Sequence, residues 1–315
     1  MFADDSPLAI TLVATLSQAR SERDKKTVYP GEVRWQGSTF PVEVTLRGNR
    51  RLNREVCAFL PLRLNFDKKG VANSVFEGQT DLKLVVRCRA DSRHADYLRS
   101  EFLIYKALNL LTPLSYSVRW VDVTYADSDK RMEDRTEGAF FVERLGRLAK
   151  RNGGESVAVE KIEVAQLDAP AAALLNLFQF LIANPDYSMI SPPPSGECCH
   201  NAKLVTGPNP NTYTPMIYDF DSSGAISAKY AVSSAVLKID KVTERVYMGY
   251  CEQNGDLPNA RAQLLALRAQ LIAVSSDDTF LSQAKKARIM RFLQTGFEIL
   301  ADDRTFERKV VGACR

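Results

Sequence analysis

The segment Asp81-Leu-Lys-Leu-Val-Val-Arg-Cys88, together with the residues 96–111 that follow it, decides the fold class predicted here. In the first part Lys83 lies between two leucines, as in a strand with one polar and one apolar face. In the second part apolar residues recur at spacings of three and four, which is typical of a helix. The apolar residues with this spacing are Leu98, Phe102, Tyr105 and Leu108.

Most of the sequence before this helix has the pattern of strands. Apolar or alternating runs predict strands over residues 8–16, 32–35, 41–46, 59–66 and 81–88, and two more near 116–125 and 138–143. The first 150 residues therefore predict a mainly antiparallel sheet with one helix inserted late. We take them as a β-rich N-terminal lobe, 1–150.

Residues 151–315 have a different character and predict a mainly helical C-terminal lobe. Helices are expected over residues 171–183, 259–273 and 278–300, and two short strands, 202–205 and 216–218, flank a turn. The sequence thus predicts an α+β protein of two lobes.

Composition and charge exclude several classes of protein. Of 315 residues, 45% are hydrophobic and 25% are charged, which excludes a disordered or collagen-like chain. The net charge of +4 is too small to predict a nucleic-acid partner. No apolar run approaches the ~18 residues of a membrane span. With only two histidines, a His-rich metal site is not expected.

Six cysteines allow up to three disulfides. The sequence contains no CxxC pair, so a zinc site is not expected. Cys57 and Cys88 fall on candidate strands of one lobe and are the expected pair. The alternative is six thiols in a cytosolic protein. Residues 2–7, Phe-Ala-Asp-Asp-Ser-Pro, resemble the stub left by signal peptidase, with cleavage before Asp4. We therefore expect a periplasmic or secreted protein.

The two-lobed layout is one that nucleotide phosphotransferases use, which directs attention to Lys83 and Glu101. A lysine on a core strand is costly unless an anion meets it. Glu101, on the following helix, is spaced to pair with such a lysine, and both are candidate catalytic residues. The alternative is that each of them faces solvent.

A second group of candidates follows the apolar helix. Asp186 ends the segment Asn184-Pro185-Asp186, and Asn201 opens a short strand beyond a Pro-rich segment. The aspartate is placed to accept a substrate proton, and the asparagine carbonyl is a suitable ligand for Mg²⁺. The alternative is that Asp186 only caps a turn.

The third group is Ile217-Tyr-Asp-Phe-Asp-Ser-Ser-Gly224, in which a strand ends in an acid. Asp219 is the expected metal ligand, and Asp221 binds the same ion or a second one. An ordinary turn or a calcium-like loop is the alternative. Glu143, at the predicted junction of the lobes, is either a ribose contact or a surface acid.

In this ordered set the sequence resembles the spore-coat-H-type (CotH-like) atypical protein kinase family. The resemblance covers roughly residues 40–225. It rests on Leu46-Arg-Gly-Asn49, on the strand at 61–66, and on the Lys83, Glu101, Asn184–Asp186, Asp219 and Asp221 positions. It implies a two-lobed protein-kinase-like fold, ATP with Mg²⁺ or Mn²⁺, and phosphorylation of a target outside the cytoplasm.

The same resemblance implies roles for single residues. Lys83 would contact the nucleotide phosphates, Asp186 would be the catalytic acid, and Asn201 and Asp219 would hold the metal. No Gly-rich loop precedes Lys83, and Arg47 is the nearest candidate phosphate contact. The acceptor, a protein, a glycan or a metabolite, is not determined by the sequence.

Three alternatives remain at this point. Transfer of AMP instead of the γ-phosphoryl group is one. A catalytically degenerate binding or scaffold protein of the cell envelope is another, because the Pro-rich segment interrupts the catalytic loop. The third is a carbohydrate-binding sandwich, with Trp35 and Trp120 as stacking platforms.

Overall fold

A computed structural model of the chain describes residues 1–48, 50–193, 196–232, 237 and 239–315. The chain forms two compact units. The first contains Met1–Leu98 and Ser117–Arg144, and the second contains Arg99–Tyr116 and Leu145–Arg315. The chain passes from one unit to the other three times, first within helix α2, Ser92–Leu111, then after Tyr116 and after Arg144.

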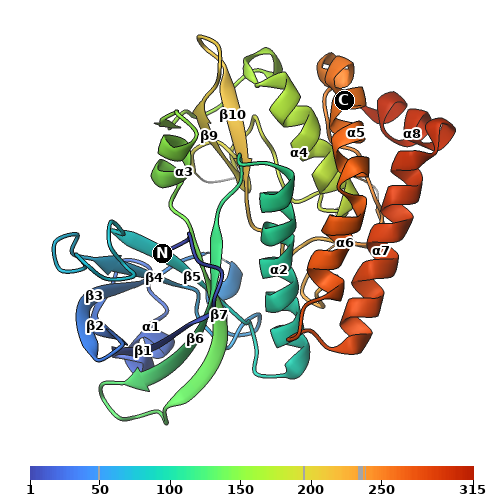
Figure 1. Cartoon of the computed structure of the whole chain (residues 1–315). Helices are drawn as coiled ribbons and strands as arrows, with labels where there is room; N and C mark the ends of the chain where they lie inside the picture. The colour runs from blue at the N-terminus through green and yellow to red at the C-terminus, as the bar shows by residue number, and fades with distance from the viewer. Residues whose placement is uncertain (49, 194–195, 233–236, 238) are drawn as a thin grey trace. The chain divides into compact units, whose positions relative to one another are not determined.

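Seven strands of the first unit form a closed barrel in the order β1-β2-β3-β4-β5-β7-β6 (Figure 1). Their bounds are β1 Leu8–Ala14, β2 Val28–Trp35, β3 Ser38–Leu46, β4 Leu62–Phe66, β5 Asp81–Val86, β6 Val118–Asp127 and β7 Arg135–Val142. Helix α1, Leu16–Glu22, follows β1. The strand positions predicted from alternation therefore agree broadly with the structure.

The predicted fold class, however, is wrong. Strand β1 pairs in parallel with β6, from Leu8 opposite Val121 to Ala14 opposite Asp127, and this pairing closes the sheet into a mixed barrel. The chain thus does not adopt a two-lobed protein-kinase-like fold with an open antiparallel N-terminal sheet. The alternation of side chains identifies a strand but carries no information about a distant parallel partner, which explains the error.

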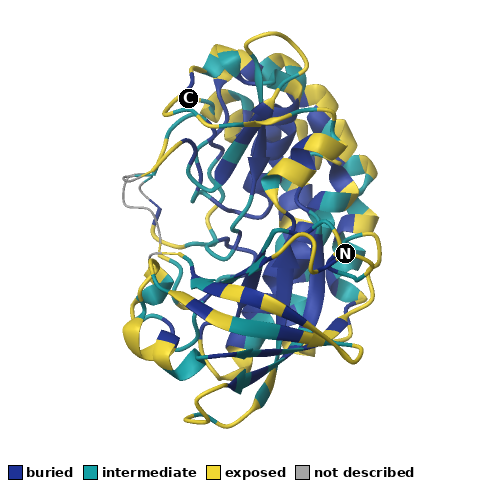
Figure 2. Cartoon of the chain, turned by 90° about the vertical axis from the view of Figure 1, so that its left-hand side faces the viewer, coloured by how far each residue is buried: buried dark blue, intermediate teal, exposed yellow. Residues whose placement is uncertain are grey.

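The barrel interior is filled by the inward-facing side chains of its strands. Leu12, Val33, Val44 and Leu64 have no exposed surface, and each comes from a different strand. Figure 2 shows such buried positions alternating with exposed ones along the strands. Outside this core, Gly138 on β7 lies under the Trp120 ring, where a Cβ atom would approach the ring to 2.5 Å.

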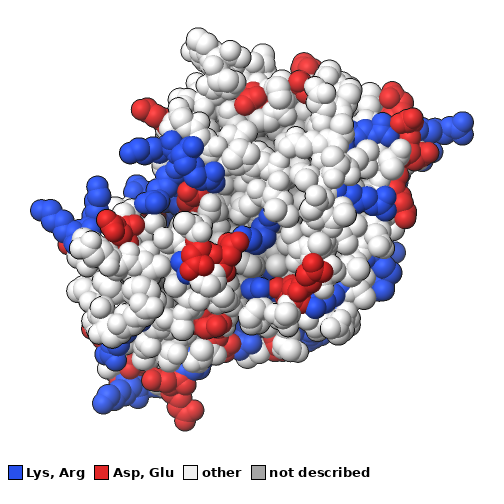
Figure 3. Space-filling view, viewed as in Figure 1, with Lys and Arg blue, Asp and Glu red and all other residues white. Residues whose placement is uncertain are grey.

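Three disulfides form in the structure, and the expected Cys57–Cys88 pair is confirmed. The others are Cys198–Cys199 and Cys251–Cys314. Within the described ranges, no helix combines the length and the apolar character needed to cross a bilayer. Positive and negative side chains are interspersed over the face shown in Figure 3.

The second unit contains a three-stranded antiparallel sheet in the order β10-β9-β8 and most of the helices. The bounds are β8 Ser156–Val157, β9 Ala202–Thr206, β10 Tyr213–Ile217, α3 Leu145–Arg151, α4 Ala169–Leu181, α5 Leu257–Ala266, α6 Arg268–Ser276, α7 Gln283–Ala301 and α8 Asp303–Lys309. The two short strands expected here are confirmed. The helix expected over 259–273 is two helices, because the chain leaves helical geometry at Leu267.

Helix α4 is the centre of the second unit. All of its residues from Ala171 to Leu181 are buried, so the helix is enclosed on every side, and its two polar residues, Asn176 and Gln179, are hydrogen-bonded. Its N-terminus is capped by Asp168, which accepts a hydrogen bond from the Ala171 N–H and another from the Thr214 hydroxyl. The helix is thereby fixed at the end that lies next to β10.

Candidate functional site

The loop that follows α4 presents Asp186 in a defined conformation. Ala183 turns the chain out of the helix with a φ of +51°. The Asn184 side chain then donates to Gln179 Oε1 at 3.0 Å and accepts from the Asp186 N–H at 3.3 Å. The second contact is an Asx turn, which fixes the backbone just before the aspartate.

Asp186, His200 and Asn201 come together in one hydrogen-bonded group. His200 Nε2 lies 2.7 Å from Asp186 Oδ1. Asn201 Nδ2 donates to the Asp186 backbone oxygen at 2.6 Å and to Oδ2 at 3.2 Å. Asn201 adopts a left-handed conformation with a φ of +48°, which asparagine tolerates better than most residues. Two loops are therefore joined by the same carboxyl group.

The electrostatics of this group favour an ion pair. The hydrogen bond from His200 is the main cause that lowers the pKa of Asp186 below its ordinary value, against the effect of burial. The same bond raises the pKa of His200, and the charge of Asp219 raises it further. His200 is therefore cationic over a wider range of pH than a free histidine, and it donates to the carboxylate.

Asp219 lies at the end of β10 on a second left-handed residue, with a φ of +66°. Its backbone N–H donates to the Tyr105 hydroxyl at 2.8 Å, and the Tyr105 ring packs edge-on against Phe220. No residue in the described part of the chain donates a hydrogen bond to the Asp219 carboxylate. The side chain is half-buried, so this carboxylate is available to a ligand.

The loop after Asp219 is docked on the end of α4, and this brings the two acids into one region. The Gly224 N–H donates to the Ala183 oxygen at 2.8 Å, and the Ala225 N–H donates to the Ile182 oxygen at 3.0 Å. A Cβ atom at Gly224 would lie 2.4 Å from the Val242 oxygen, so only glycine fits. We call Asp186, His200, Asn201 and Asp219 the Asp186 cluster.

The remaining metal candidate, Asp221, is two residues beyond Asp219. It is half-buried, and its Oδ1 accepts from the Ser222 hydroxyl at 3.3 Å. The described residues contain no group of three or more His, Cys, Asp or Glu side chains arranged to hold a metal ion.

The other predicted residues are placed on several elements. Lys83 is half-buried on β5 of the first unit, and Glu101 is buried on the part of α2 that belongs to the second unit. Arg47 follows β3, where its N–H donates to the Pro61 oxygen at 3.1 Å, and Asn49 lies outside the described residues. Their predicted roles, including the pairing of Lys83 with Glu101, stay predictions.

Glu143 is buried at the end of β7 in the first unit. Its carboxylate accepts from the Ser117 N–H at 3.0 Å, and its own N–H donates to the Ser117 oxygen at 2.9 Å. The ribose contact considered for Glu143 stays a prediction. Of the Pro-rich segment near the Asp186 cluster, residues 194–195 lie outside the described part of the chain.

Two contributors to the cluster have no signal in the sequence. Tyr105 has the spacing of a core residue on a helix, yet its hydroxyl accepts the Asp219 N–H. Ser222, whose hydroxyl donates to Asp221 Oδ1, also helps to lower the pKa of Asp186. His200 is adjacent to Asn201, and this adjacency suggests a positioning role, but its partner could not be named from spacing.

Comparison of the chain with known protein families and with curated protein sequences gave no match. The resemblance to the CotH-like kinases therefore remains a prediction from the sequence.

Proposed function

We propose that the Asp186 cluster is the active site of an ATP-dependent phosphotransferase that uses Mg²⁺ or Mn²⁺. The observation that carries this proposal is the double hydrogen bond from Asn201 to Asp186, in which an amide of one loop holds a carboxyl group of another. Asp219 at the end of the neighbouring strand adds a carboxylate without a described donor. Phosphoryl transfer needs such positioning more than it needs covalent chemistry.

In this proposal Asp186 orients the acceptor hydroxyl and accepts its proton. Oδ1 is bonded to His200, so Oδ2 is the oxygen directed to the acceptor. Asn201 fixes the orientation of that oxygen, and the His200 imidazolium holds the opposite side of the carboxyl group. With its pKa below the ordinary value, Asp186 is ionised at neutral pH and can accept hydrogen bonds from the acceptor hydroxyl.

The side chains at the cluster fit Mg²⁺ or Mn²⁺ in a nucleotide-bound form. Because Asn201 donates through Nδ2, its Oδ1 is left for a ligand, and Asp219 supplies a carboxylate. Mg²⁺ is commonly held by one or two carboxylates together with substrate phosphates. Asp221, two residues further on, is the candidate for an additional contact. When bound, the ion would neutralise charge on the transferred group.

The reaction class includes transfer of the γ-phosphoryl group or of AMP, since the same residues would orient a hydroxyl in either case. The acceptor is an unidentified protein, glycan or metabolite. We place the protein in the periplasm or outside the cell, and the support for this placement is that all six cysteines form disulfides.

The test is turnover of ATP by the purified protein with Mn²⁺ or Mg²⁺, followed by mass spectrometry of any modified product. Asp219→Asn and Asp186→Asn should each reduce turnover at least about 100-fold. Asp277→Asn, at an exposed acid of the same unit, should leave it unchanged. Absence of both turnover and metal-dependent nucleotide binding would refute the proposal.

A catalytically degenerate binding or scaffold protein is the second candidate. It is favoured by the engagement of Asp186 with His200 and by the lack of a three-ligand metal cluster among the described residues. Thermal unfolding separates the two, because a bound ligand raises the melting temperature. Stabilisation by ATP with Mn²⁺ but without turnover would support a nucleotide-binding scaffold.

A further inference from the structure

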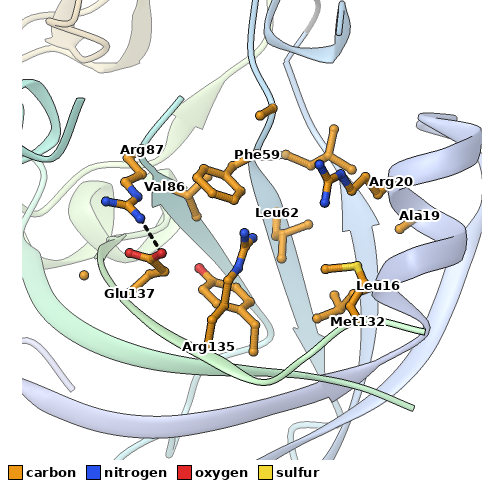
Figure 4. A pocket seen from close by; sticks show the side chains of 14 residues that line it. Leu16, Ala19, Arg20, Phe59, Leu62, Val86, Arg87, Met132, Arg135 and Glu137 are labelled. Carbon is orange, nitrogen blue, oxygen red and sulfur yellow. Dashed lines mark hydrogen bonds and ion pairs between the residues drawn. The ribbon is translucent and has the colours of Figure 1, made fainter. Parts of the chain in front are cut away.

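The first unit has an apolar pocket between α1 and the barrel strands, remote in sequence from the Asp186 cluster (Figure 4). The centre of a water-sized group can move through about 50 Å³ of this pocket. Leu16, Phe59, Leu62 and Val86 provide apolar walls. The pocket therefore suits a short aliphatic segment.

A wider groove of about 440 Å³ adjoins this pocket. The two hollows share Arg20, Ala58 and Met132, so they are continuous. Arg23 and Arg54 also line the groove, and no acidic residue is found among its described lining residues. The charges of Arg54 and Arg20, after burial, lower the pKa of Arg23, as expected where cations lie close together.

Arg135 is the cation inside the apolar pocket. Its guanidinium lies 3.8 Å from the centre of the Phe59 ring, and Figure 4 shows it between Phe59 and Met132. Within the described part of the chain its buried Nε has no hydrogen-bond partner. By contrast, the nearby Arg87 is paired with Glu137. The charge of Glu137 raises the pKa of Arg135 as well, but among the described residues its carboxylate is bonded to Arg87, so the Arg135 guanidinium can bind a further anion.

Tyr125 provides a second polar group in the same pocket. Its side chain is more than nine-tenths buried, and no partner for its hydroxyl is found among the described residues. A buried hydroxyl without a partner is costly, and a ligand that accepts its hydrogen bond would remove that cost. Burial also raises the pKa of Tyr125, so the hydroxyl remains a donor.

We propose that the apolar pocket and the basic groove form one binding site for an amphiphile with a short aliphatic chain and an anionic headgroup. The chain occupies the apolar pocket. A carboxylate or phosphate lies at the junction of the two hollows, where it accepts hydrogen bonds from Arg135, Arg20 and the Tyr125 hydroxyl. Such charge-assisted bonds are strong when partly buried. This site is independent of the phosphotransferase proposal.

Methyl NMR of methionine tests the site directly, because Met132 lines both hollows. Of the chain's six methionines, only Met132 and Met1 belong to the first unit. Butyl phosphate and pentanoate should each shift the Met132 methyl signal in a saturable way, and their relative affinities distinguish a phosphate from a carboxylate headgroup. 1-Butanol and inorganic phosphate should bind at least about tenfold more weakly.

Two variants and a control complete the experiment. Arg135→Gln should weaken butyl phosphate binding about tenfold. Ala58→Trp should block the junction of the two hollows and so reduce butyl phosphate binding. If that variant does not fold, the Arg135→Gln variant alone serves as the test. Arg34→Gln, at an exposed arginine of β2, should leave the affinity unchanged. The proposal is overturned if neither anion moves the Met132 signal, if butanol or phosphate alone binds equally well, or if Arg135→Gln has no effect.

Discussion

In the barrel of the first unit, strands pair along their whole length and bury aliphatic side chains, whereas in the Asp186 cluster three loop residues leave the usual backbone conformations. Ala183, Asn201 and Asp219 all have positive φ and either precede or belong to the cluster. In the first unit, by contrast, positive φ occurs in the connections between strands, as at Gln36 in the turn between β2 and β3 and at Asn73 in the loop between β4 and β5.

The backbone conformation of each region follows from the groups that the region must present. A closed barrel satisfies its backbone polar groups by strand pairing, so its interior needs only apolar side chains. The Asp186 cluster presents carboxyl, amide and imidazole groups together, and irregular backbone is what directs them to one place. Strained residues are tolerated there because neighbouring hydrogen bonds hold them. Stability and chemistry are therefore expected to respond to different mutations.

The largest expected effect on stability is at the barrel core. Leu12→Ala removes a side chain with no exposed surface, and it should lower the free energy of unfolding by about 2–5 kcal/mol. Both tryptophans, Trp35 and Trp120, belong to the first unit, so urea unfolding followed by their fluorescence reports on the barrel. Val28→Ala, at an exposed position of β2, should cost less than about 1 kcal/mol. Equal losses in the two variants would contradict this assignment of the core.

Removal of the Cys57–Cys88 disulfide should have the next largest effect. The bond joins residues 31 apart, and its loss in the double variant Cys57→Ala, Cys88→Ala should cost about 2–4 kcal/mol by the same fluorescence measurement. The matched control is the double variant Cys251→Ser, Cys314→Ser in the second unit. If the control shifts the tryptophan transition as much as the first variant does, the disulfide does not act locally on the barrel.

A smaller effect is expected at the cluster from His200→Gln. The variant should raise the pKa of Asp186, because the bond from His200 is the main cause of its lowering. The acid limb of the pH–turnover profile should then move to higher pH, with turnover reduced about tenfold because Asp186 loses an orienting partner. Chemical-shift titration of Asp186 checks the pKa directly. An unchanged pKa would show that the ion pair is absent in solution.

The ion pair between His200 and Asp186 also makes the free energy of unfolding depend on pH, both on the alkaline and on the acid side. The His200 contribution is fully present below its ordinary pKa of 6.5 and is lost as pH rises through its raised pKa. The Asp186 contribution is present above 3.8 and is lost as pH falls through its lowered pKa. His200→Gln should remove the first dependence and reduce the second, because Asn201 still donates to Asp186, and thermal unfolding across pH measures both changes.

The smallest expected effect is a gain in barrel stability at the β2–β3 turn. Gln36 and Gly37 both have positive φ, which is the geometry of a hairpin turn that favours Asn-Gly. Gln36→Asn should therefore stabilise the first unit by about 0.5 kcal/mol. The tryptophan transition in urea again provides the measurement. A loss of stability would mean that the Gln36 side chain makes a contribution beyond its backbone.

Local pattern predicted most of the strands, the apolar helix α4 and the turn that carries Asp186. Local pattern failed where the structure depended on contacts between residues far apart in the sequence. The helix expected over 259–273 is interrupted at Leu267, and β8, only two residues long, has no pattern to detect. The sequence around His200 and Tyr105 does not indicate their hydrogen-bond partners, because a hydrogen bond between distant segments produces no periodic pattern.

By itself, the sequence determined which segments alternate and that an apolar helix stops before Asn184-Pro185, since these depend on neighbouring residues. It also made Cys57 and Cys88 the expected pair, although both lie in loops and not on strands. Only the tertiary structure decided that β1 pairs in parallel with β6 and closes a barrel, and that His200 holds Asp186. The physical reason is the same in both cases. Backbone pairing and side-chain hydrogen bonds between remote segments depend on the path of the whole chain, which local preference does not encode.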